Sequence, residues 1–351
     1  MGHFDNILGH GESLIKNEAA LDFEFIPKLI PHREKEQQEI AAAIKLLFMN
    51  RNGRNMFIYG SPGVGKTVAV RHVLRELEDT SDEIKIVYIN CWQKNTSYKV
   101  AVDICNQIGF KFVQNKNTTE LFQVIARIVN ESAAVFVFDE IDKVEDTDFL
   151  YNILEQVYKK TLILITNYHS WLIDLDERVR SRLTPEQIEF KKYNAIETKS
   201  ILKDRLSYAF PSGVLDDEAF DIIAKKAGEI GDVRTGIFLL KESAYIAEES
   251  SKRKIGVEDV IKAISKLDTF TIKNSDALEE DTKFIYEIIK EHSGTKIGDL
   301  YELYQKKGGK SGYKTFQRKI EKLSENKFIK TTKSTGKGGN TTIVEKKLTD
   351  F

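Results

Sequence analysis

The sequence predicts an α/β protein with a parallel-sheet core, a small helical domain, and a C-terminal domain of three helices and a hairpin. Two observations carry this prediction: short apolar runs alternate with helical patterns up to residue 192, and four helical stretches follow up to residue 267 before the pattern changes again. The length of 351 residues is also typical of two or three domains. We place an N-terminal arm at 1–24, the core at 25–192, the helical domain at 193–268, a linker at 269–280 and the last domain at 281–351.

Composition excludes several classes of protein. The chain is 41% hydrophobic and 30% charged, which is typical of a globular protein rather than a disordered or collagen-like one. Cys91 and Cys105 are too few for a disulfide framework or a zinc site, and we expect both to be small buried residues. No apolar run approaches the roughly 20 residues of a membrane-spanning helix, and the first residues lack a signal-peptide pattern. We expect a cytoplasmic or nuclear protein with no membrane partner.

The core is predicted from short runs that are apolar throughout rather than alternating. Such runs are typical of strands buried on both faces, as in a parallel sheet covered by helices. A helical pattern over residues 33–49 precedes the first of them. The predicted strands are 56–59, 84–89, 133–138, 162–166 and 188–190, and the predicted helices of the second domain are 195–209, 216–227, 232–249 and 257–267.

A phosphate-binding loop follows the first predicted strand. Residues 60–67 read Gly-Ser-Pro-Gly-Val-Gly-Lys-Thr, which satisfies G-x-x-x-x-G-K-[ST] in full. The glycines let backbone N–H groups wrap phosphates, and the next helix adds the dipole of its N-terminus. We expect ATP or ADP here, with Lys66 at the β- and γ-phosphates and Thr67 as a ligand of Mg²⁺. The nucleotide-binding residues of the loop are Gly60, Gly63, Val64, Gly65, Lys66 and Thr67.

Polar residues follow the third and fourth predicted strands, at the edge where parallel sheets bind ligands. Asp139 and Glu140 follow the run 133–138, and Asn167 follows the run after it. We expect Asp139 to bind both the nucleotide and Mg²⁺, Glu140 to polarise the attacking water as a general base, and Asn167 to position that water. The alternatives are a helix-capping acid pair and a turn asparagine; the phosphate loop favours the catalytic interpretation.

These motifs, in this order, resemble those of the AAA+ ATPases, together with residues 178–183 and the Gly-Asp-Val-Arg at 231–234. More narrowly, residues 25–36 resemble the entry motif of the archaeal origin-recognition replication initiators, relatives of the eukaryotic origin recognition complex. The resemblance implies an AAA+ core with a helical lid and an ATPase that hydrolyses ATP slowly. It implies a DNA-binding initiator that recognises duplex origin DNA and helps to load the replicative helicase, with copies or paralogues of itself as further partners.

The resemblance also implies roles for single residues. Arg182 corresponds to an arginine finger given to the γ-phosphate of a neighbouring subunit, a group that can be worth about 10³–10⁵ in rate. Arg234 corresponds to a lid residue that reaches the nucleotide, and Tyr193 and Arg205 to residues that flank it. The alternative for Arg182 is a surface arginine paired with a nearby acid, and Arg178 is either structural or an auxiliary sensor.

The C-terminal part of the chain is strongly basic. Residues 305–347 contain 13 Lys or Arg and three acidic residues, so the rest of the chain carries a net charge of -11 against -1 for the whole. A basic end on an acidic body favours binding of a polyanion. The alternative is a solvated Lys-rich tail.

From residue 281 onward, three helical patterns followed by a Gly-rich hairpin predict a winged helix, whose third helix and hairpin lie in this basic part. The third pattern, residues 313–323, has an apolar side and an opposite basic side, and the strand-like runs 327–333 and 341–347 follow it. We expect the basic side to enter a major groove and the hairpin to contact phosphate or the minor groove; the alternative is a winged helix for protein contacts. The expected DNA-binding residues are Lys314, Thr315, Arg318, Lys319, Lys322, Lys333 and Lys337.

A second DNA contact is implied by the resemblance at residues 90–99, where the initiators carry a helix that touches DNA. The candidates here are Lys94, Tyr98 and Lys99. Amphipathic packing explains the apolar residues that follow without any DNA. With DNA as its partner, the protein is expected to be associated with the nucleoid.

Two other classes of ATPase are weighed against an initiator. A regulatory P-loop ATPase with a winged helix would act as a nucleotide-controlled transcriptional or signalling switch, but such proteins usually lack Ser181-Arg182 and the motif at 231–234. A clamp-loader-like subunit would carry a collar domain in place of a basic winged helix. A DNA-binding module without enzymatic activity is disfavoured by the complete set of metal-binding and water-positioning residues.

Overall fold

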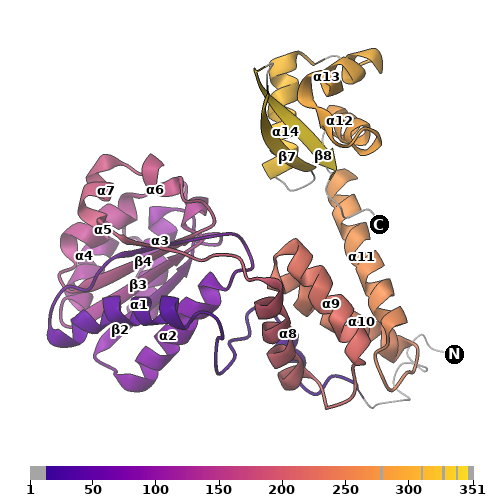
Figure 1. Cartoon of the computed structure of the whole chain (residues 1–351). Coiled ribbons are helices and arrows are strands. Elements are labelled where there is room, and N and C mark those ends of the chain that lie inside the picture. Colours follow the sequence, from indigo (N-terminus) through magenta and orange to yellow (C-terminus); the bar gives the residue numbers. More distant parts are fainter. Residues whose placement is uncertain (1–12, 277–279, 310, 326–328, 337–338, 347–351) are drawn as a thin grey trace. The chain divides into compact units, whose positions relative to one another are not determined.

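The computed structural model of the chain divides into two compact units, Met1–Val260 and Ile261–Phe351 (Figure 1). It describes residues 13–276, 280–309, 311–325, 329–336 and 339–346. Across these ranges, no helix combines the length and the apolar character needed to cross a membrane.

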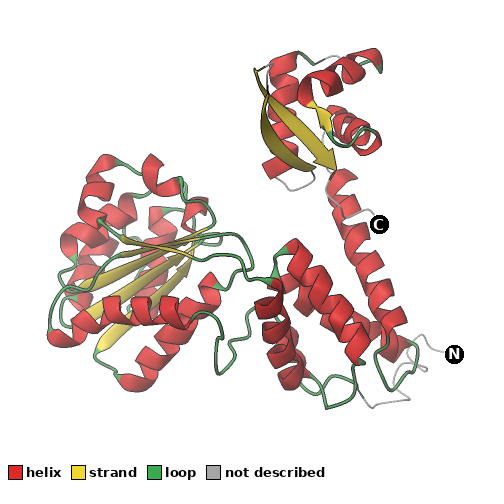
Figure 2. Cartoon of the chain, in the orientation of Figure 1, coloured by secondary structure: helices red, strands yellow, loops and turns green. Residues whose placement is uncertain are grey.

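A parallel sheet with the strand order β2-β3-β4-β1-β5 forms the core of the first unit (Figure 2). The prediction of strands buried on both faces is confirmed, because β3 and β4 are buried along their whole length. β2 lies at one edge of the sheet and β5 at the other. The strands are β1 Met56–Tyr59, β2 Ile84–Asn90, β3 Ala133–Asp139, β4 Lys160–Thr166 and β5 Glu186–Glu189.

Helices cover both faces of this sheet (Figure 1). Met56 and Ile58 enter an apolar cluster with α1 and α2, whereas Phe57 between them enters a second cluster with α3, α4, α5 and α7. Successive side chains of a strand therefore all meet apolar partners, which is why the strands lack alternation in the sequence. The helices are α1 Glu34–Lys45, η2 Leu46–Met49, α2 Lys66–Thr80, α3 Ser97–Gln107, α4 Thr118–Val129, η3 Ile141–Lys143, α5 Asp148–Gln156, α6 Trp171–Asp174 and α7 Glu177–Leu183.

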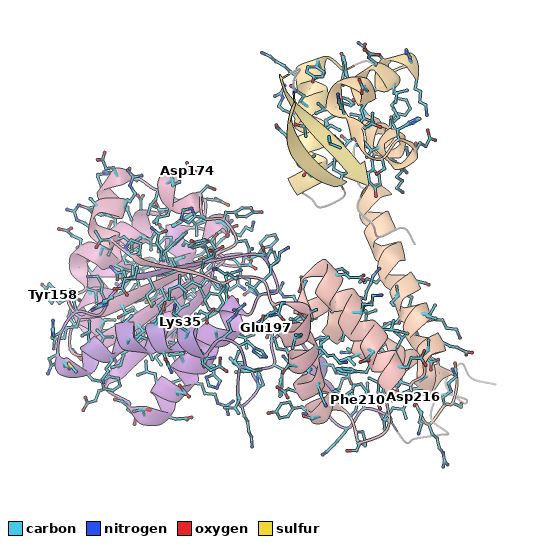
Figure 3. The ribbon with its side chains drawn as sticks, in the orientation of Figure 1. Lys35, Tyr158, Asp174, Glu197, Phe210 and Asp216 are labelled. Atoms are coloured by element: carbon cyan, nitrogen blue, oxygen red, sulfur yellow. The ribbon has the colours of Figure 1, made fainter. Side chains whose placement is uncertain are left out.

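A helical lid follows the core, as predicted. Asn194 begins it with a capping box, in which its side chain accepts from the N–H of Glu197 and the Glu197 carboxylate accepts from the N–H of Asn194 (both 2.9 Å). Glu197 is labelled at this helix start in Figure 3. The lid consists of α8 Ala195–Ala209, α9 Asp217–Ile230, α10 Val233–Glu249 and the beginning of α11 Val257–Asp276.

The described part of the N-terminal arm packs on the lid helices. The short helix η1, Glu18–Leu21, contacts α8 and α10. The N–H of Leu14 donates to Glu248 Oε1 (2.6 Å), and Lys241 forms an ion pair with Glu18 (3.1 Å). The described part of the arm predicted over 1–24 is therefore held against the lid helices, beginning with Ser13, which also donates to Glu248 Oε1 (2.8 Å).

The linker predicted over 269–280 is helical for most of its length, rather than the aperiodic stretch that its composition indicates. α11 continues to Asp276, and α12 begins at Glu280; residues 277–279 lie outside the described ranges. The polar composition suggested a linker, but residues 257–276 contain neither Gly nor Pro, so no residue in this stretch stops the helix.

The second unit contains the predicted three helices and hairpin. Its core includes Ile285 and Ile289 from the first helix, Leu300 from the second, and Phe316 and Ile320 from the third. A two-residue strand, β6, pairs with β8, and β8 pairs with β7, all antiparallel. The sequence pattern did not predict β6, which is too short to show periodicity. The elements are α12 Glu280–Glu291, β6 Thr295–Lys296, α13 Ile297–Lys306, α14 Tyr313–Glu325, β7 Ile329–Gly336 and β8 Gly339–Lys346.

Candidate active site

The phosphate-binding loop joins the end of β1 to the start of α2 in a backbone conformation that requires glycine. Gly63 and Gly65 have φ values of 76° and 87°, in the left-handed region. A Cβ on Gly63 would lie 1.9 Å from Asp232 Oδ1, and one on Gly65 would lie 2.7 Å from the Tyr193 hydroxyl. The loop is therefore packed directly against the residue that begins the lid helix α10 and against the tyrosine expected to flank the nucleotide.

Lys66 lies at the first position of α2 and is directed into the loop. Its Nζ donates to the carbonyl oxygens of Gly60 (2.7 Å) and Ser61 (3.0 Å) and to Asn167 Oδ1 (2.9 Å). Burial lowers the pKa of the Lys66 ammonium group to about 8, against the opposing effect of the Asp139 carboxylate. A polyphosphate beside this amine would favour its charged form. The structure thus brings Lys66 and Asn167 together, as the sequence predicts.

The Asp139 carboxylate is held by donors from three neighbouring segments. Oδ2 accepts from Thr67 Oγ1 (2.8 Å) and from the hydroxyl of Tyr88, and Oδ1 accepts from the N–H of Glu140 (2.9 Å). The Thr67 hydroxyl donates its hydrogen to Asp139 and so keeps its lone pairs for another partner. An acidic and a hydroxyl oxygen in contact fit the ligand preference of Mg²⁺.

Glu140 lies directly after β3 with φ 55°, a conformation that is costly for a residue with a side chain. Burial, with further contributions from the carboxylates of Asp139 and Asp142, raises the pKa of Glu140. A carboxylate whose pKa lies nearer to neutral pH is a stronger base at that pH. The backbone strain and the electrostatics both fit the predicted general base.

A cavity of about 330 Å³ lies beside this set of residues. It is lined by the phosphate loop, by the lid and by the residues between η1 and α1, 22–33, which we call the entry segment. A second cavity, of about 30 Å³, shares Lys66, Thr67, Asp139 and Glu140 with it and adds Asn167. The large cavity is lined, among others, by Ile26, Pro27, Ile30, Pro31, Gly63, Val64, Gly65, Tyr193, Ile201, Arg205, Val233, Arg234 and Ile237.

Two arginines fix the walls of the large cavity. Arg33, which is not among the expected site residues, donates from Nε to the carbonyl of Val64 (3.1 Å), and its guanidinium carbon lies 4.0 Å from the centroid of the Tyr193 ring. Arg205 lines the cavity as predicted, but its Nη1 donates to the carbonyl oxygens of Ala20 (3.2 Å) and Phe25 (3.4 Å). Arg205 thus anchors the entry segment, a contact between residues 180 positions apart that sequence patterns do not show.

Arg182 and Arg178 are paired within their own neighbourhood of the core. Arg182 Nε lies 2.9 Å from Glu155 Oε2, and its guanidinium faces the Tyr151 ring. Arg178 pairs with Asp176, the residue that caps α7 (3.1 Å). Among the described residues that line the two cavities, neither arginine occurs. Arg182 is therefore not placed to act on the nucleotide site of its own chain.

The predicted DNA-binding residues of the winged helix fall into three groups. Lys314 and Arg318 are exposed on α14, and Thr315 is half-buried beside them. Lys319 differs from the expectation, because its Nζ donates to Asp281 Oδ2 (2.8 Å) and its side chain is 18% exposed. The amphipathic pattern placed Lys319 on the basic side, whereas Asp281, at the start of α12, draws it toward the domain. The side chains of Lys322 and Lys333, and the whole of Lys337, lie outside the described residues.

The segment after β2 presents the second set of predicted DNA contacts. Tyr98 and Lys99 are exposed in the first turn of α3. Lys94 forms an ion pair with Asp103 (3.7 Å), and Lys99 donates to Asn95 Oδ1 (2.8 Å).

The two cysteines, Cys91 and Cys105, are fully buried, as predicted.

Comparisons with known proteins place this chain among related ATPases. A family model for an AAA domain matches residues 49–169, and a model for the Cdc6 AAA+ ATPase-type lid domain matches residues 199–265. The ORC1-type DNA replication protein 1 of Archaeoglobus fulgidus is 31% identical over 344 residues, which cover 92% of this chain and 84% of the relative. The chain belongs to the archaeal ORC1/Cdc6 family of DNA replication proteins.

Further matches cover nearly the whole chain. ORC1-type DNA replication protein 2 of Methanosarcina mazei is 29% identical, with 98% of this chain and 96% of the relative covered. Among solved structures, the Aeropyrum pernix ORC1 protein in complex with DNA has a TM-score of 0.69 at 25% identity, covering 95% of this chain and 94% of that one. Cdc6p of Pyrobaculum aerophilum shares the fold, with a TM-score of 0.65 at 20% identity over 96% of each chain.

These matches confirm the resemblance inferred from the motifs. This ORC1/Cdc6 chain is an AAA+ ATPase and a DNA replication initiator. The alternative of a transcriptional or signalling switch is not favoured.

Proposed function

We propose that this protein binds duplex DNA at a replication origin and that ATP with Mg²⁺ governs the binding, with slow hydrolysis as a reset. One observation carries the proposal: Lys66, Thr67, Asp139 and Glu140 meet Arg234 of the lid around the same pair of cavities. A nucleotide there would contact both the core and the lid. Its presence or loss would then change how the two are held together.

Within this proposal, Lys66 and the loop amides bind the phosphates, while Thr67 and Asp139 hold Mg²⁺. The metal, when bound, neutralises charge on the phosphate oxygens. Glu140 accepts a proton from the attacking water, and Asn167 positions that water. In the structure, the Asn167 side chain accepts a hydrogen bond from Lys66. Tyr193 and Arg205 flank the nucleotide on the side of the entry segment.

Arg182 supplies the remaining positive charge from a neighbouring copy or paralogue. Its exposed position outside the cavities of its own chain supports this role. A site that depends on a neighbour hydrolyses ATP slowly when the chain is alone, which suits a reset rather than a motor. The replicative helicase is the partner that the initiator would load, and the protein would be associated with the nucleoid.

We propose two DNA contacts, one on α14 and the hairpin of the winged helix and the other on the segment after β2. The winged-helix surface retains Lys314, Thr315, Arg318 and Lys322 of α14 and the hairpin residues Lys333 and Lys337. Lys319 is left out because Asp281 already pairs with it. Lys94, Tyr98 and Lys99 form the second contact, with Tyr98 and Lys99 exposed in the structure.

Single substitutions distinguish base contacts from phosphate contacts on this surface. We propose that Arg318 reads a base edge, and we therefore expect Arg318→Ala to cost about 1–3 kcal/mol on the preferred duplex and much less on a random one. Lys333→Ala should lower the affinity for both duplexes by the same factor. It should also reduce the slope of log affinity against log salt concentration by about one. Titration of specific and random duplexes at several salt concentrations measures both effects.

Lys35→Ala is the matched control, because it removes one positive charge from α1, where the side chain is 86% exposed (Figure 3). It should leave both affinities unchanged. Wild-type affinity in both Arg318→Ala and Lys333→Ala would assign the winged helix to protein contacts instead.

A further inference from the structure

Tyr88 on β2 contacts the metal-binding carboxylate from a strand to which the sequence analysis assigned no site residue. Its hydroxyl donates to Asp139 Oδ2, the same oxygen that accepts from Thr67. Tyr88 pairs in register with Val137, two residues before Asp139, so its side chain reaches along the sheet to the end of β3. The contact therefore follows from the parallel register of β2 and β3.

The backbone of Tyr88 is fixed at the open edge of the sheet. Its N–H donates to Gln107 Oε1 and its carbonyl accepts from Gln107 Nε2, each at 2.9 Å. β2 is an edge strand, so this amide takes the place of a missing neighbouring strand. Gln107 ends α3 and is itself held by a bond from Nε2 to Asp103 Oδ2 (2.8 Å).

The ring of Tyr88 is fixed as well. The guanidinium carbon of Arg71 lies 4.6 Å from the ring centroid, a cation–π distance. Arg71 belongs to α2, one turn beyond Thr67, and lines the large cavity. Ring and backbone are thus both held, and the hydroxyl has a defined position beside Asp139.

We propose that Tyr88 is a positioning residue that sets the orientation of the Asp139 carboxylate for Mg²⁺; this inference rests on the proposed nucleotide–metal site. With Tyr88 in place, the carboxylate keeps its rotamer without depending on Thr67, whose oxygen is needed by the metal. Without the hydroxyl, Asp139 would retain Thr67 and the N–H of Glu140 as partners. Loss of such an outer-shell hydrogen bond typically costs about 10–100-fold in metal affinity.

Tyr88→Phe tests the proposal, because it removes the hydroxyl and keeps the ring. ADP affinity of the full chain is measured by equilibrium titration in EDTA and at increasing Mg²⁺. We expect the Mg²⁺ concentration that gives half of the affinity gain to rise about tenfold, with ADP affinity in EDTA unchanged. Tyr158→Phe is the matched control, since Tyr158 is 71% exposed and precedes β4 at the opposite end of the sheet (Figure 3).

The outcomes separate the possible failures. A purely structural role for Tyr88 would lower the unfolding temperature and weaken ADP binding equally with and without Mg²⁺, and that result would overturn the proposal. An unchanged Mg²⁺ requirement in Tyr88→Phe would overturn it too. If wild-type protein binds ADP equally well in EDTA and in Mg²⁺, the metal site itself is wrong, and the inference falls with it.

Discussion

Replacing Lys66 by Ala is expected to abolish nucleotide binding, whereas Glu140→Gln is expected to keep ATP bound and stop its hydrolysis. Lys66 is the buried cation expected to pair with the nucleotide phosphates. Truncating one partner of a buried charge pair typically costs about 2–5 kcal/mol or more in affinity. Glutamine keeps the size of Glu140 but cannot accept the proton of the attacking water. Loss of a general base typically costs about 10²–10⁴ in rate.

Nucleotide affinity and single-turnover hydrolysis are measured for both variants. Lys35→Ala again serves as the control for removal of a positive charge. Circular dichroism checks that Lys66→Ala is folded, because the amine also bonds the carbonyls of Gly60 and Ser61. Wild-type turnover in Glu140→Gln would remove this residue from the catalytic role.

A comparably large effect is expected from Arg182, but only between subunits. Arg182→Ala should bind ATP normally yet lose the stimulation that a neighbour provides, which for arginine fingers is about 10³–10⁵ in rate. Mixing it with Lys66→Ala separates the two parts of the site. Lys66→Ala has an intact Arg182 but cannot bind nucleotide. Arg182→Ala binds nucleotide but lacks the arginine. ATPase activity should therefore recover in the mixture, as measured by phosphate release.

A mixture of Lys66→Ala with Glu140→Gln is the matched control, because neither partner has a working site. It should stay inactive. Arg180 lies on the same helix, and its side chain donates to the carbonyl of Ile173. Arg180→Ala should therefore behave like wild type. Equal activity of Arg182→Ala and wild type under conditions where copies assemble would contradict the role in trans.

The residues of the candidate site could be placed together from the sequence because they lie at the ends of parallel strands. Asp139 ends β3 and Asn167 directly follows β4, and such ends meet at the same edge of the sheet as the loop after β1. A motif of fixed spacing placed Lys66 and Thr67 beside them. The sequence therefore contained both the chemistry and its approximate position.

Contacts between distant segments could not be predicted in this way. Tyr88 appears in the sequence as one more aromatic residue of a strand, and only the register of β2 against β3 brings it to Asp139. Arg205 was assigned from resemblance, but its bonds to the entry segment depend on how the lid folds back on residues 20–25. Lys319 shows the same limit, because helical periodicity placed it on the basic side while Asp281 pairs with it.

Footprinting of the full chain on its own chromosomal DNA, once with ATP and once with ADP, tests the proposed initiator most directly. We predict discrete protected duplex sites whose extent or occupancy differs between the two nucleotides. Glu140→Gln with ATP should reproduce the ATP pattern and hold it, because the nucleotide is not consumed. Protection spread evenly along the DNA, or an identical pattern with ATP and ADP, would contradict a nucleotide-governed origin-binding protein.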